Sequence, residues 1–174
     1  NEPELMKQSQ KIVILSFRGE SPLRTVVDEA QIFASVAHRV TNRIPNTLFL
    51  LDGIALPLDR SREVLARHAA RSKVIKKVST LLAGINYLDL SPLPLRDRVP
   101  YYSAADFFLT HEGSTHHRVG WLFPHIPGYL LTGDDRPEAV SRWHTNQTDH
   151  RNPGQLSANP KSAALPAEAN RALR

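Results

Sequence analysis

The stretch KIVILSF at residues 11–17 decides the fold, because it is a continuous run of apolar and β-branched residues. Such a run is typical of a strand that is buried on both faces, as in a parallel sheet. A similar run, TLFLLDG at residues 47–53, follows a segment in which apolar residues recur every three or four positions, up to a turn at Pro45-Asn46. Strand, helix and strand in this order predict a right-handed βαβ unit.

The same alternation continues along the chain. It predicts a helix from Asp59 to about Leu82, strands at 84–90, 106–110 and 128–131, and short helices at 99–104 and 119–123. We therefore expect an α/β fold, a Rossmann-like parallel sheet flanked by helices, as a single domain over residues 11–133. Residues 1–10 would be an N-terminal extension. Residues 134–174 would be a C-terminal segment that is flexible from about residue 151, because it has few large apolar residues.

The composition narrows the function classes. The chain has 174 residues, 41% of them hydrophobic, which suffices for a core, and it has no cysteine, which excludes disulfides, thiolate metal sites and a cysteine nucleophile. No apolar run approaches the ~20 residues of a membrane span, and the polar N-terminus lacks the apolar core of a signal peptide. We expect a cytoplasmic protein with no membrane span. The first residue is not Met, so we also expect a processed product or a fragment of a larger protein.

The net charge of +5 favours anionic partners. The basic residues are spread along the chain and are not interleaved with aromatic residues, so we do not expect nucleic acid as the main partner. The basic segment from Arg60 to Lys77 leaves a nucleic-acid-associated domain as a weaker alternative.

Ligands of open α/β sheets bind beyond the carboxyl ends of the strands, where polar residues follow three of the predicted strands. Ser16 and Arg18 follow the first strand, and the Arg18 guanidinium could hold a diphosphate or could simply pair with Glu20 at the surface. Asp52 ends the second strand and could bind a ribose hydroxyl or could only form a turn. No Gly-x-Gly-x-x-Gly motif follows the first strand, so we expect no nicotinamide or flavin cofactor.

The third cluster, HEGST at residues 111–115, follows the fourth predicted strand. Gly113 would let the backbone approach a ligand, and Ser114 or Thr115 could cap the next helix, whose first amides suit a phosphate. The alternative is an ordinary turn with a good cap. His111 or Glu112 could act as a general acid–base group. The nearby histidines lack the spacing of a helical zinc motif, so we expect no metal.

Two segments together resemble a known family. IVILSFRGESPLRTVVDEAQIFASVAHRVTNRIPNTLFLLDG and YYSAADFFLTHEGSTHHRVGWLFPHIPGYLL are similar to patterns of bacterial glycosyltransferase-like proteins, namely to the C-terminal, nucleotide-sugar-binding half of a GT-B fold. The resemblance covers most of residues 11–132. It implies that Arg18 and the loop from His111 to Thr115 face the diphosphate of a nucleotide-sugar donor, and that glycosyl transfer is metal-independent. It also implies an N-terminal partner domain in a larger enzyme. The alternative is a non-catalytic ligand-binding or protein-interaction module.

Overall fold

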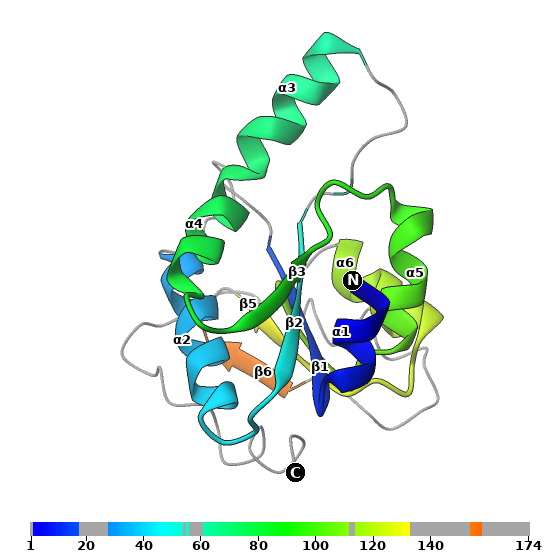
Figure 1. The fold of residues 1–174 in the computed structure, drawn as a ribbon. Coiled ribbons are helices and arrows are strands. Elements are labelled where there is room, and N and C mark those ends of the chain that lie inside the picture. The colour runs from blue at the N-terminus through cyan, green and yellow to red at the C-terminus, as the bar shows by residue number, and fades with distance from the viewer. Residues whose placement is uncertain are drawn as a thin grey trace.

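The computed structural model of the chain describes residues 2–17, 28–53, 55, 61–111, 114–132 and 154–157 (Figure 1). The strands are β1 (Lys11–Ser16), β2 (Thr47–Asp52), β3 (Asn86–Asp89), β4 (Phe107–His111), β5 (Gly128–Thr132) and β6 (Gly154–Ser157). The helices are α1 (Glu2–Gln8), α2 (Glu29–Thr41), α3 (Arg62–Arg71), α4 (Lys73–Leu81), α5 (Leu95–Ser103) and α6 (Ser114–Leu122).

The strands form one sheet in the order β3-β2-β1-β4-β5-β6, and every neighbouring pair is parallel. The predicted α/β fold with a Rossmann-like parallel sheet is therefore confirmed. β1 lies at the centre and pairs with β2 on one side and with β4 on the other. Its four apolar residues are all buried, as the run KIVILSF predicts for a central strand.

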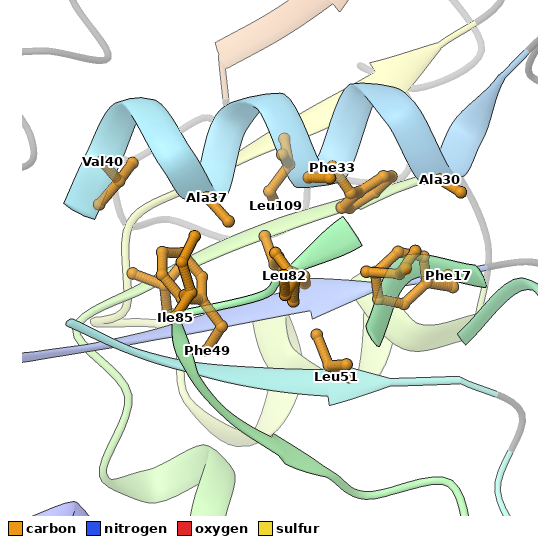
Figure 2. Close-up of a cluster of buried hydrophobic side chains, with 14 of the residues drawn as sticks. Phe17, Ala30, Phe33, Ala37, Val40, Phe49, Leu51, Leu82, Ile85 and Leu109 are labelled. Carbon is orange, nitrogen blue, oxygen red and sulfur yellow. The ribbon is translucent and has the colours of Figure 1, made fainter. Parts of the chain in front are cut away.

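Helices cover both faces of the sheet. Alternate side chains of β1 point to opposite faces, so Val13 and Leu15 belong to one core cluster and Ile12 and Ile14 to the other. The first cluster lies under α2 and α4, and Figure 2 shows the apolar side of α2 facing the strands. The second cluster lies under α5 and α6, with partly buried residues of α1 packed against it. In the described part of the chain, no helix combines the length and the apolar character of a membrane span.

The structure differs from the sequence-based expectation in several elements. The helices α5 and α6 begin at Leu95 and Ser114, earlier than the expected starts at residues 99 and 119. The single helix expected from Asp59 to Leu82 is two helices, α3 and α4, which meet at Ser72. The backbone N–H and the hydroxyl of Ser72 both donate to the carbonyl oxygen of His68, and such side-chain bonding to the preceding turn bends helices. A further helix, α1, lies within the expected N-terminal extension. The strand β6 lies within the segment expected to be a flexible tail, and the rest of that segment lies outside the described residues.

Candidate functional site

The carboxyl ends of the three central strands bring together two of the predicted site residues. Ser16 ends β1 and is paired in register with Asp52 of β2 on one side and with Thr110 of β4 on the other. All three residues are buried. The backbone N–H of Phe17 continues the pairing by donating to the Asp52 carbonyl oxygen at 2.7 Å. Residues from strands far apart in the sequence thus form one continuous row at this edge, as the parallel sheet requires.

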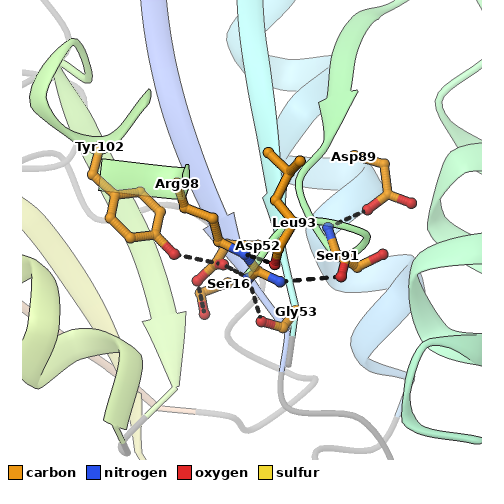
Figure 3. A network of polar contacts seen from close by, with 8 residues as sticks. All are labelled: Ser16, Asp52, Gly53, Asp89, Ser91, Leu93, Arg98 and Tyr102. Carbon is orange, nitrogen blue, oxygen red and sulfur yellow. Dashed lines mark hydrogen bonds and ion pairs between the residues drawn. The ribbon is translucent and has the colours of Figure 1, made fainter. Parts of the chain in front are cut away.

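Asp52 lies at the centre of a buried polar network (Figure 3). Its carboxylate accepts hydrogen bonds from Arg98, from the Tyr102 hydroxyl at 2.8 Å and from the Ser16 hydroxyl at 3.3 Å. The side chains of both ion-pair partners, Asp52 and Arg98, are fully buried. Because a buried carboxylate is stable only when it is paired and hydrogen-bonded, these three donors account for its presence in the core.

The Arg98 guanidinium makes further bonds to backbone carbonyl oxygens. Nη1 donates to Gly53 at 2.8 Å, Nη2 to Ser91 at 3.2 Å and Nε to Leu93 at 3.1 Å. Arg98 lies on α5, whereas its carbonyl partners follow β2 and β3. The side chain therefore joins α5 to the ends of two strands, and its planar fork suits a cation with several fixed acceptors.

Tyr102 lies one helical turn after Arg98 on α5, so both side chains reach Asp52 from the same side. Burial, and secondly the negative charge of Asp52, raise the pKa of Tyr102 well above its ordinary value of about 10. The hydroxyl thus stays protonated and remains a hydrogen-bond donor to the carboxylate.

From the sequence, Asp52 was expected either to bind a ribose hydroxyl or only to form a turn, and its partners Arg98 and Tyr102 were not identified. The structure places the Asp52 carboxylate inside the protein, where internal donors occupy it. The available signal was the four-residue spacing of Arg98 and Tyr102, but the expected helix began only at residue 99. Arg98 therefore fell in a segment, LPLRDRVPYY, whose charges suggest a solvent-exposed surface. A contact between residues 46 positions apart leaves no local pattern.

The loop after β4 is the second part of the candidate site. His111 is the last residue of β4, and Ser114 and Thr115 are the first two residues of α6. Only two residues separate the strand from the helix, so α6 begins directly beyond the carboxyl end of β4. The predicted site residues Arg18, Glu112 and Gly113 lie outside the described residues.

The described residues contain no group of three or more His, Cys, Asp or Glu side chains that could hold a metal ion. No protein-family model and no curated protein sequence matches the chain.

Proposed function

We propose that the edge between β1 and β4 binds the diphosphate of a nucleotide-type ligand, and that the chain is the nucleotide-sugar-binding half of a GT-B glycosyltransferase. The strand order carries this proposal. The chain builds the sheet outward from β1 through β2 to β3, and then returns to the other side of β1 to add β4, β5 and β6. In open parallel sheets the crevice for a ligand lies at this reversal, beyond the carboxyl ends of the two strands that flank it.

The groups around the reversal suit a phosphate. The first turn of α6 begins beside the end of β4, and the free amides of a helix N-terminus carry partial positive charge. Arg18, two residues after Ser16 in the sequence, would add a guanidinium that can bind two phosphate oxygens. The two sources of positive charge would lie on either side of the crevice, at the ends of neighbouring strands.

In the reaction implied by this reading, the bond between the sugar and the diphosphate breaks, and the acceptor hydroxyl takes the place of the diphosphate at the anomeric carbon. Arg18 and the α6 amides would stabilise the negative charge of the leaving diphosphate without a metal. His111 or Glu112 would act as the general acid–base group and take the proton from the acceptor hydroxyl. A second domain would have to supply the acceptor, so this chain would act as part of a larger enzyme.

One observation favours the alternative, a binding module without catalysis. The described side chains in the row at this edge, those of Ser16, Asp52 and Thr110, are all buried, and Asp52 is engaged by Arg98. Of the site residues named from the sequence, His111 and Glu112 would therefore carry the acid–base chemistry. In the larger protein that contains this chain, exchange of both for Ala would abolish turnover of a nucleotide sugar by an enzyme, whereas a protein in which the chain is a binding module shows no turnover before or after the exchange.

Calorimetric titration of the chain with uridine, guanosine, cytidine and adenosine diphosphates tests the proposal. We expect at least one to bind, and Arg18→Ala to weaken that binding about tenfold or more, as expected for loss of a charge-assisted hydrogen bond. Gly113→Val should block binding without a change of charge. Arg96→Ala is the matched control, because Arg96 is 81% exposed on α5 and its removal changes the net charge equally. If no diphosphate binds at about millimolar concentration, where even a weak specific site is occupied, the proposal is wrong.

A further inference from the structure

The positive charge of the protein is concentrated on one pair of helices. Helices α3 and α4 carry six of the 22 Lys and Arg residues but only one of the 17 Asp and Glu residues. The other 16 basic and 16 acidic residues of the chain cancel, so the excess on α3 and α4 equals the net charge of +5. Basic residues occur along the whole sequence, but in α3 and α4 they are not balanced by acidic residues.

Three lysines form a continuous face on α4. Lys73, Lys76 and Lys77 are spaced three and four residues apart, so they lie on the same side of the helix, and all three are exposed. The opposite side of α4 presents Ile75 and Val78 to the core. Of the ion pairs described, none includes any of the three lysines. The α4 lysine face is thus an array of ammonium groups without intramolecular partners among the described side chains.

Helix α3 extends this charged surface away from the domain. Figure 1 shows α3 projecting beyond the edge of the sheet at which the strands end, and its main contacts are with α4. Arg62 at its start is exposed, and Val64 and Leu65 on its first turn are only partly buried. A helix that projects in this way can reach a flat surface before the rest of the domain does.

We propose that α3 and the α4 lysine face dock on the surface of an anionic lipid bilayer. Lysine ammonium groups act as point charges that do not need a fixed acceptor geometry, which suits the diffuse charge of lipid headgroups. Nucleic acid fits less well, because no Phe, Tyr or Trp, the residues that build the usual stacking platforms for bases, occurs from residue 50 to residue 86. The partly buried Val64 and Leu65 offer a small apolar area for the headgroup boundary.

Docking in this orientation would hold the carboxyl edge of the sheet close to the bilayer, because α3 projects past the same edge. The inference rests on the charge distribution and on the position of α3, so it does not depend on the proposed nucleotide site. If the chain binds diphosphates but not vesicles, only the docking proposal is wrong. If it binds vesicles but not diphosphates, only the nucleotide-site proposal is wrong.

Co-sedimentation with vesicles tests the inference. We expect the chain to bind vesicles of phosphatidylcholine mixed about two to one with phosphatidylglycerol, and not vesicles of phosphatidylcholine alone. Binding should fall steeply between about 0.05 M and about 0.5 M salt, because exposed charges are screened over a shorter distance at high ionic strength. Equal binding to both kinds of vesicle, or no binding to either, would overturn the proposal.

The triple variant Lys73→Gln, Lys76→Gln, Lys77→Gln should lose about a hundredfold in vesicle affinity, since each lysine near an anionic surface contributes about fivefold. The matched control exchanges three exposed basic residues elsewhere, Lys7, Arg43 and Arg96, for Gln. Its affinity should fall less than tenfold despite the same change in net charge. Equal losses in the two triple variants would show that only net charge matters. Tighter binding of RNA than of anionic vesicles by the parent chain would show that nucleic acid is the partner.

Discussion

Replacement of Arg98 by Met tests the role of the buried network most directly. The change keeps an unbranched side chain in the same space but leaves the Asp52 carboxylate buried with two neutral donors among the described residues, the hydroxyls of Tyr102 and Ser16. Three backbone carbonyl oxygens also lose a donor. Removal of one partner of a buried ion pair costs about 3–5 kcal/mol, so we expect Arg98→Met to lower the free energy of unfolding by about that amount. This is a large part of the 5–15 kcal/mol typical of a domain.

Urea unfolding followed by circular dichroism measures the effect, and a double-mutant cycle with Asp52→Asn identifies its cause. Asp52→Asn alone leaves the Arg98 cation without a counter-ion, whereas the double variant leaves no unpaired buried charge. The double variant should therefore lose at least about 2 kcal/mol less than the sum of the single variants. Arg96→Met on the exposed side of α5 should change stability by less than about 0.5 kcal/mol. The hypothesis of a stabilising buried ion pair would be wrong if the losses of the two single variants added up to that of the double variant. It would also be wrong if Arg98→Met lost less than about 1 kcal/mol.

Two further predictions concern pH and packing. Because the pKa of Tyr102 is higher in the folded protein than its ordinary value of about 10, the unfolded chain releases this proton first, and the free energy of unfolding should fall as the pH rises above about 10. Urea titrations between pH 9 and 11 should show a shallower fall for Tyr102→Phe, and parallel curves would contradict the assignment. Gly128→Ala would place a Cβ 2.5 Å from atoms of the Phe108 ring, so we expect a loss of about 1–3 kcal/mol in urea unfolding. In the control, Gly84→Ala, the added Cβ meets no atom within 4 Å, and we expect a loss of only about 1 kcal/mol because the backbone φ of 79° is unfavourable for Ala. Equal losses of stability in the Gly128 and Gly84 variants would show that the Phe108 ring moves aside.

The sequence predicted the elements whose burial follows from their own residues. The runs around Ile14 and Leu50 are apolar throughout, so both were recognised as buried strands of a parallel sheet to within a residue of their observed ends. Gly154–Ser157, by contrast, is a short polar stretch whose pairing with β5 depends on the strand already in place. The break between α3 and α4 also escaped prediction, because Ser72 lies inside an otherwise regular helical pattern.

The candidate site was predictable only in its position. Parallel strands end at one edge, so Ser16 and Asp52 could be placed together before the structure was known. The partner of Asp52 could not be predicted, since an arginine between Asp97 and Val99 on a short helix is usually solvated, and only the return of the chain across the sheet buries Arg98. The predicted contact of Asp52 with a ribose stays a prediction, and any such contact would compete with Arg98 for the same carboxylate.

The central position of β1 has a consequence for synthesis of the chain. β1, β2 and β3 are complete by residue 89, whereas β4, which covers the other side of β1, begins only at residue 107. A nascent chain that has folded its first half exposes one side of β1, a row of free backbone N–H and C=O groups flanked by the apolar side chains of residues 12–15. Such an open strand can pair with another chain. Proteolysis between residues 90 and 106 should therefore promote aggregation, whereas a cut after β5 leaves β1 covered on both sides.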